Sequence, residues 1–281
     1  MMKYTRYPTL SAFREDWEET LARDEVVANL FFACLHGEDR IETGFWGASA
    51  VNGDGTLLSI RRGDKGMVVY HTGEGVADLC ARLVRGMEED DYWPDQYIGP
   101  AGTVGELVRR INALGVRRYG VAMNQRVHAL RAVKPVPEAE GFFAQVTEMG
   151  DCLVDYDMDF QREVRNTVTR QEVEKQVRHM IGEGRLYGWR LGEKIVSIAM
   201  KTRETPHGQF ISRVYTPAEE RGRGYATSCV AALSRLVLRE GNEYCGLFTD
   251  LDNPISNHIY KKMGYEPVCD FTLYRLEGDP K

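Results

Sequence analysis

The sequence predicts a mixed α/β fold, a mixed central sheet flanked by helices, and three observations lead to this prediction. Hydrophobic residues make up 43% and charged residues 28% of the 281 residues, as in soluble globular proteins. Apolar residues recur at helical spacing in some segments and alternate with polar residues, as in strands, in others. The two kinds of segment are interspersed, with hairpins between some strands and helices between others. A chain of this length also suits about two domains.

The first part of the chain shows the weaker pattern. Trp17, Leu21 and Leu30 recur at roughly helical spacing and predict one or two helices within residues 16–35. Asn52-Gly-Asp-Gly55 is a turn signal between two short strands. The other elements expected here are strands at 45–51, 56–60, 66–71 and 119–130, and helices at 75–86 and 102–114.

Residues 134–141, with the sequence Lys-Pro-Val-Pro-Glu-Ala-Glu-Gly, interrupt these patterns. Their prolines, charges and glycine are typical of a linker or an exposed crossing. We therefore predict a domain at residues 1–135 and a second domain at residues 141–281.

The second part is easier to interpret. A helix that begins at Asp151 places Leu153, Tyr156 and Phe160 on one face. The turn Gly192-Glu193 separates two strands. The elements expected here are strands at 142–147, 186–191, 195–201, 209–216, 244–250 and 265–276, and helices at 151–165, 171–182, 224–239 and 254–263.

The charge and the cysteine pattern exclude several classes of protein. There are 42 acidic and 36 basic residues, a net charge of −6, which gives no general attraction to nucleic acid or to an anionic membrane. No apolar run approaches the ~18–20 residues of a membrane span, and the charged N-terminal segment lacks the apolar core of a signal peptide. The six cysteines are widely separated, so we expect free thiols, no metal site and a cytoplasmic protein.

The most informative segment joins a strand to the long helix at 224–239. It reads Arg221-Gly222-Arg223-Gly224-Tyr225-Ala226. Glycines let the backbone approach a ligand closely, and the first turn of a helix offers free N–H groups and the positive end of its dipole. The segment suits an anion such as a pyrophosphate, although a plain turn with two solvated arginines is the alternative. It matches neither a Walker loop nor a Rossmann fingerprint.

This segment resembles the phosphate loop of the GNAT acyltransferase superfamily, in which Gln or Arg is followed by Gly three positions later and by Gly or Ala five positions later. A second segment, from Asp252 to Tyr265, is similar to the family's NPxSNxxYxxxGF motif, with Tyr265 in place of Phe. The resemblance covers roughly residues 141–276 and is close to bacterial tandem-domain members. It implies a catalytic GNAT domain at 141–281, preceded by a degenerate GNAT-like domain without a cofactor.

By this resemblance, the strand that ends at Thr216 hydrogen-bonds the pantetheine arm of acetyl-CoA through its backbone. The Val214 N–H would also stabilise the oxyanion of the thioester, and the loop amides would hold the pyrophosphate. A simple core strand is the alternative for this segment. The residues expected to bind acetyl-CoA are Val214, Tyr215, Thr216, Arg221, Gly222, Arg223, Gly224, Tyr225, Ala226, Asn253, Ser256 and Asn257.

The resemblance assigns Tyr260 as the acid that protonates the departing CoA thiolate, and a tyrosine packed against the sheet is the alternative. Many members place a glutamate on the strand that ends here at Thr216, but this strand carries Phe-Ile-Ser-Arg at residues 210–213. The general base therefore stays open among Asp250, Glu163 and His207. The acidic residues of the helix from Asp151 either attract a cationic amine or form a solvated face.

We expect an N-acetyltransferase that moves an acetyl group from acetyl-CoA to a primary amine by direct attack in a ternary complex. The acceptor would be a small molecule or a peptide, and the protein a monomer or homodimer. One alternative is a catalytically inactive CoA-binding regulatory module. Another is an N-acyltransferase that uses a longer acyl-CoA. The nearest equivalent of the glycine loop in the first part is Ile98-Gly-Pro-Ala-Gly-Thr103, which has no arginine before its glycines.

Overall fold

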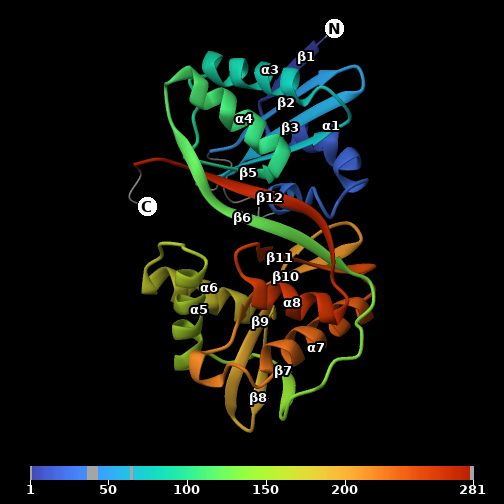
Figure 1. The fold of residues 1–281 in the computed structure, drawn as a ribbon, viewed down its shortest axis with the longest axis vertical. Helices are drawn as coiled ribbons and strands as arrows, with labels where there is room; N and C mark the ends of the chain where they lie inside the picture. Colours follow the sequence, from blue (N-terminus) through green and yellow to red (C-terminus); the bar gives the residue numbers. More distant parts are fainter. Residues whose placement is uncertain (1, 37–43, 64–65, 279–281) are drawn as a thin grey trace. The chain divides into compact units, whose positions relative to one another are not determined.

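The computed structural model describes residues 2–36, 44–63 and 66–278. The described strands are β1 (Met2–Tyr7), β2 (Trp46–Asn52), β3 (Gly55–Arg61), β4 (Met67–Thr72), β5 (Gln96–Pro100), β6 (Tyr119–Leu130), β7 (Phe142–Gln145), β8 (Leu186–Leu191), β9 (Lys194–Glu204), β10 (Gly208–Tyr215), β11 (Tyr244–Asp250) and β12 (Glu266–Leu276). The described helices are α1 (Leu10–Ala22), α2 (Asn29–Leu35), α3 (Val76–Glu89), α4 (Ala101–Leu114), α5 (Asp151–Glu163), α6 (Arg170–Gly182), α7 (Tyr225–Arg239) and α8 (Pro254–Met263), with a short 3₁₀ turn at Ala218–Glu220. Figure 1 shows these elements in chain order.

The chain forms two compact units that are not consecutive halves. The first unit contains residues up to Val127 and the segments Thr249–Asn253 and Pro267–Pro280. The second contains His128–Phe248 and Pro254–Glu266. The final strand β12 therefore belongs almost entirely to the first unit, where it pairs antiparallel with β5. The predicted domains 1–135 and 141–281 stay a prediction, and their ends at residue 1 and residues 279–281 lie outside the described residues.

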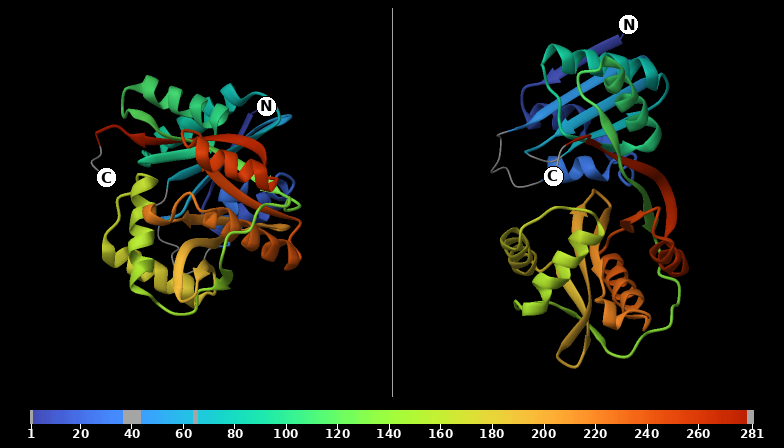
Figure 2. Two further views of the ribbon diagram at one scale, coloured as in Figure 1. Left: turned by 60° about the horizontal axis from the view of Figure 1, so that its bottom comes forward. Right: turned by 60° about the vertical axis from the view of Figure 1, so that its left-hand side comes forward.

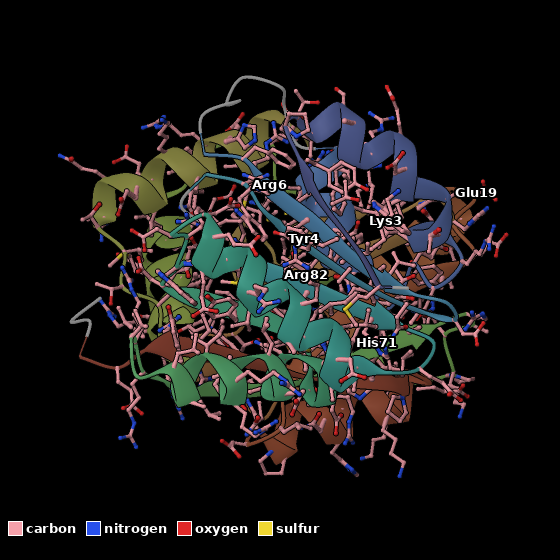
Figure 3. All side chains as sticks on the ribbon, turned by 90° about the horizontal axis from the view of Figure 1, so that it is seen from above. Lys3, Tyr4, Arg6, Glu19, His71 and Arg82 are labelled. Carbon is pink, nitrogen blue, oxygen red and sulfur yellow. The ribbon has the colours of Figure 1, made fainter. Side chains whose placement is uncertain are left out.

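In the first unit, the strands follow the order β1-β2-β3-β4-β5-β12-β6, with β6 in this unit up to Val127, and helices cover both faces of the sheet (Figure 1). Leu57 packs with α3 and α4, whereas its neighbour Leu58 packs with α1 and α2. This is the alternation expected of a strand that is buried on both faces. Arg82 of α3 lies 4.1 Å from the centre of the Tyr4 ring of β1, and Figure 3 labels both residues.

In the second unit, the order β11-β10-β9-β8-β7 repeats this plan. α7 and α8 pack on one face, around Cys229 and Trp189, and α5 and α6 pack on the other, around Val173 and Ile198 (Figure 2). Each unit is thus a helix–sheet–helix layer structure with two cores. The mixed sheet and the flanking helices predicted from the sequence are confirmed.

The same element order, βααβββαβαβ, occurs first in β1 to β6 and then in β7 to β12. The expectation that the two parts share one fold plan is therefore confirmed. β1 and β5 were not predicted. The predicted counterpart of the glycine loop, residues 98–103, joins β5 to α4 and so corresponds instead to the connection from β11 to α8. The true counterpart is Gly73-Glu74-Gly75, between β4 and α3.

The segment predicted as a linker packs along the second unit. The Lys134 N–H donates to the Met263 carbonyl at 2.9 Å, and the Ala139 N–H donates to Ser228 Oγ at 2.8 Å. The Trp189 indole donates to the Glu140 carbonyl, also at 2.8 Å. Residues 134–140 are therefore fixed by backbone hydrogen bonds, which a flexible linker would not make.

Candidate functional site

The candidate site lies in the second unit, where β10 and β11 separate. Their parallel pairing joins Gly208 to Tyr244, and its last pair is Phe210 with Gly246, although β10 continues to Tyr215 and β11 to Asp250. Beyond this point the edge of β10 that faced β11 is available to another hydrogen-bonding chain. An extended ligand with amide groups can bind such an edge as an added strand.

A β-bulge in β10 lies just past the point of separation. Ser212 faces Met200 and Tyr215 faces Ile198, so three steps along β10 correspond to two along β9. Arg213 has a φ of 52° in this bulge. A positive φ is uncommon for a residue with a side chain and costs about 1–3 kcal/mol. The bulge changes the direction of the backbone immediately before Val214.

The glycine loop follows β10 and leads into α7. Gly222 has a φ of 79°, and Gly224, the residue that caps the N-terminus of α7, has a φ of 84°. A Cβ on Gly222 would meet no atom within 4 Å, and one on Gly224 would meet only Ala139, at 3.7 Å. The loop backbone is thus open to a ligand on this side. The first turn of α7 carries no acidic residue that would repel an anion.

Both loop arginines are held by carboxylates. Arg221 donates to Glu163 at 2.5 Å and to the Thr216 carbonyl at 2.9 Å. Arg223 donates to Glu220 at 3.0 Å. Both guanidinium groups are still about half exposed, at 50% and 57%, and any bound anion would share them with these carboxylates.

Glu220 links the glycine loop to β9 through hydrogen bonds with Arg223 and Lys194. Its side chain is only 7% exposed and accepts a hydrogen bond from Lys194 of β9 at 2.5 Å, besides the one from Arg223. The hydrogen bond from Lys194 lowers the pKa of Glu220 below its ordinary value. Nothing in the spacing of the sequence marks Glu220, because its role depends on the approach of β9.

The strand residues expected to bind pantetheine lie together at the end of β10 and just beyond it. Val214 is partly buried against the core of α7 and α8, and Tyr215 is buried on the other face with its hydroxyl donating to Asp159 at 3.1 Å. The Thr216 hydroxyl donates to Ser197 Oγ at 2.9 Å. Only the backbones of Val214 and Thr216 are thus suited to an added strand, since the Tyr215 and Thr216 side chains have partners within the protein.

Tyr260 projects from α8 into the same hydrophobic cluster as Val214 and Cys229. It is 8% exposed, and its ring meets Tyr265 edge to face with centroids 5.7 Å apart. Burial, and secondarily Cys229, raises the pKa of Tyr260. The hydroxyl is therefore protonated at neutral pH, as a general acid must be, but the raised pKa makes it a weaker proton donor than an ordinary tyrosine.

Of the remaining predicted residues, Ser256 and Asn257 lie at the start of α8 in the second unit, whereas Asn253 belongs to the first unit. The helix begins at Pro254, directly after Asn253, as the sequence predicts. Ser256 and Asn257 are partly exposed on its first turns, on the same helix as Tyr260. Tyr225 is buried beneath the loop and Ala226 is partly exposed, so of these two only Ala226 lies near the surface of α7.

Two of the three candidate bases, Glu163 and Asp250, accept hydrogen bonds within the protein through their carboxylates. Glu163 pairs with Arg221. Asp250 accepts from the Asp252 N–H at 2.9 Å and belongs to the first unit. His207 is an exposed loop residue whose carbonyl accepts from the Glu243 N–H. None of these contacts marks a base.

The acidic residues of α5 are also paired. Asp155 pairs with Arg170, Asp159 with Arg162 and Asp157 with Arg213. Asp157 is buried, so the helix face is not simply solvated.

The first unit contains a glycine turn at the position that corresponds to the loop at 221–226, between β4 and α3. Gly73 and Gly75 both have a φ of 77°, close to the values of Gly222 and Gly224, and this second glycine pair was not predicted. A Cβ on Gly73 would lie 1.9 Å from the Asp54 carbonyl oxygen, and one on Gly75 would lie 2.5 Å from Asn52 Nδ2. The turn between β2 and β3 therefore fills the space that is open beside Gly222 and Gly224.

Residues 2–36, 44–63 and 66–278 contain neither a metal-binding cluster nor a membrane-spanning helix. In those ranges, no group of three or more His, Cys, Asp and Glu side chains is arranged to hold a metal ion. Among the same residues, no helix combines the length and apolarity needed to cross a membrane.

Comparisons with known proteins agree with this geometry. Residues 183–275 match a family model described as FR47-like protein. A GCN5-related N-acetyltransferase from Sphaerobacter thermophilus is 16% identical, with a TM-score of 0.61 over 97% of this chain and 95% of that one. A GNAT acetyltransferase from Colwellia psychrerythraea is 11% identical, with a TM-score of 0.54 over 98% of both chains.

A tandem GNAT protein from the clavulanic acid biosynthesis pathway is 14% identical, with a TM-score of 0.56 over the full length of both chains. No curated protein matches the sequence. The FR47-like part includes both the loop at 221–226 and the whole segment from Asp252 to Tyr265. The chain therefore has the fold of the GNAT superfamily, as its two motifs indicate.

Proposed function

We propose that the protein is an N-acetyltransferase that transfers the acetyl group of acetyl-CoA to a primary amine of a small molecule or peptide. The observation that carries this proposal is the open glycine loop at the N-terminus of α7, next to the separated strands β10 and β11. Oriented N–H groups at a helix terminus bind a pyrophosphate, and a free strand edge binds the amides of pantetheine.

In this proposal each part of the site has one task. Residues 221–226 and the first turn of α7 bind the pyrophosphate, and the backbones of Val214 and Thr216 bind the pantetheine arm. Ser256 and Asn257 contact the same arm from α8. Acetyl-CoA supplies the activated acyl group. The Val214 N–H stabilises the negative charge that develops on the carbonyl oxygen during attack, and Tyr260 donates a proton to the leaving sulfur.

An inactive CoA-binding module is the second candidate, and one observation favours it. β10 has no carboxylate at residues 210–213, and of the candidate bases Glu163 pairs with Arg221 and Asp250 accepts from the Asp252 N–H. Acetyl-CoA binding with no CoA release from any amine would support this module. CoA release with an amine, lost in Tyr260→Phe, would support the enzyme.

The test combines two measurements on the full chain. Isothermal titration with acetyl-CoA measures binding, and a thiol-reactive dye measures CoA release over a panel of amines, polyamines, aminoglycosides, amino acids and peptides. A matched series with longer acyl-CoAs separates acetyl transfer from the transfer of longer chains. Absence of acetyl-CoA binding would overturn the proposal.

A further inference from the structure

The backbone of β10 is most constrained at a residue for which the proposed chemistry gives no role. Arg213 has a positive φ inside the bulge, directly before Val214. Glycine or asparagine would adopt this conformation more easily, so the surroundings must hold an arginine there. The contacts of its side chain identify what holds it.

The Arg213 guanidinium is clamped between α5 and α6. Nη1 pairs with Asp157 Oδ1, and Nη2 donates to Gln176 Oε1 at 2.7 Å. With its amide turned so that the oxygen faces Arg213, Gln161 accepts from Arg213 Nη1 at 2.8 Å and from Nη2 at 3.2 Å. Three side chains, two from α5 and one from α6, therefore hold the side chain of Arg213, the residue with the positive φ in the bulge.

Burial makes this clamp costly to break. The side chains of Asp157 and Arg213 are 1% and 18% exposed, so removing either charge leaves the other without a counter-charge in a poorly hydrated environment. Asp157 Oδ2 is buried and has no hydrogen-bond partner. A buried carboxylate with an incompletely satisfied oxygen stabilises a fold less than an apolar residue of similar size would. Its presence is better explained by the geometry that it imposes on Arg213.

We propose that Asp157 is a positioning residue that acts through Arg213. It holds the bulge in β10, and the bulge directs the Val214 N–H toward the carbonyl oxygen of the bound thioester. This inference rests on the proposed function, because it assigns the direction of one N–H in that site. Asp157 itself touches neither acetyl-CoA nor the acceptor, since its charge is directed at Arg213 within the protein.

The test is Asp157→Asn in the full chain, which keeps the shape of the side chain and removes its charge. We expect Arg213 to leave the positive-φ region in a crystal structure of the variant. We expect the Kd for acetyl-CoA to stay within about twofold, because the loop at 221–226 is untouched. CoA release should fall roughly tenfold or more, since misplacing a group by about 1 Å can cost on the order of 100-fold in rate.

Two further variants keep the test decisive. Gln176→Met removes an acceptor of Arg213 Nη2 without leaving a buried charge unpaired, and it should shift kcat in the same direction by a smaller factor. Glu174→Gln, on the same helix, breaks only the exposed pair with Arg178, and it should leave the Kd and kcat unchanged.

The outcomes separate this inference from the proposed function. If the unmodified chain does not bind acetyl-CoA, the proposed function fails. If the unmodified chain is active and Asp157→Asn keeps both its kcat and the positive φ of Arg213, the positioning role is wrong. A loss of kcat matched by an equal rise in Kd would also overturn it, because the bulge would then serve binding.

Discussion

At the scale of single residues, Tyr260 shows what sequence alone could and could not give. The motif placed Tyr260 on the helix after Pro254, with Asn257 on the same face, and the helix begins where predicted. Burial of the side chain among Cys229, Val214 and Tyr265 depends on how α7, α8 and β10 meet. Helical periodicity cannot distinguish a buried hydroxyl from a wet one, so the pKa shift was not predictable.

Replacement of Tyr260 by Phe should lower turnover with little change in acetyl-CoA affinity. The ring and its packing against Tyr265 remain, and only the proton donor is lost. General acid catalysis by one side chain contributes typically ~10²–10⁴-fold. CoA release and isothermal titration on the same preparation test this. A loss of less than about threefold would assign protonation of the thiolate to water, or place the slow step in product release.

The raised pKa of Tyr260 also predicts a pH dependence. Its pKa in the folded protein exceeds the ordinary value of 10.0, so the hydroxyl stays protonated below pH ~10 and ionises only as pH rises through the raised value. At a saturating amine concentration, ionisation of Tyr260 should therefore cause no fall in turnover between pH 7 and pH ~10. The pH profiles of the wild type and of Tyr260→Phe should have the same shape over this range. An alkaline loss centred near pH 9, absent in the variant, would contradict the shift.

At the scale of elements, the long periodic segments were predictable and the local irregularities were not. The helix expected at 224–239 is α7, Tyr225–Arg239. It was predictable because its apolar stripe and the glycines at its ends can be recognised in the sequence without knowledge of tertiary contacts. β1 and β5 were missed because the first carries Lys3, Thr5 and Arg6 without regular alternation and the second is five residues long, with Gly and Pro. The bulge at Arg213 was not predictable, since register depends on the partner strand β9.

The buried anchor Glu220 gives the glycine loop its own pH dependence. The pKa of Glu220 in the folded protein is lower than its ordinary value of 4.5, so its contribution to stability is present above that pH and is lost as pH falls through the lowered value. Glu220→Gln should therefore lower the thermal midpoint at pH 7, and its deficit should shrink toward pH 3. A constant deficit from pH 7 to pH 3 would show that the charge of Glu220 is not what stabilises the loop.

At the scale of the whole molecule, the division of the chain was the least predictable feature. The sequence suggested one boundary near residues 134–141, but the chain changes unit after Val127, Phe248, Asn253 and Glu266. No change in composition marks these positions, because they follow from strand pairing. β12 pairs with β5, and Asp270 accepts two hydrogen bonds from Arg126, within the first unit.

This division predicts that residues 141–281 will not fold alone. A chain that begins at residue 141 lacks β5, so β12 would expose an unpaired edge, which favours aggregation. We expect this fragment to aggregate or to unfold without a cooperative transition, and co-expression with residues 1–140 to restore a soluble complex. A monomeric fragment that unfolds cooperatively and binds acetyl-CoA like the full chain would contradict this account.

The central claim is that the loop before α7 binds the pyrophosphate of acetyl-CoA, and a titration of two matched glycine variants tests it most directly. Gly224 and Gly241 both have positive φ, 84° and 98°, in open surroundings, and they lie at opposite ends of α7. Valine at either position adds similar backbone strain, but only Gly224→Val places a side chain beside the loop N–H groups. We predict a Kd for acetyl-CoA at least tenfold higher in Gly224→Val, about 1.4 kcal/mol, and a Kd unchanged in Gly241→Val. Equal affinities in the two folded variants would contradict the claim.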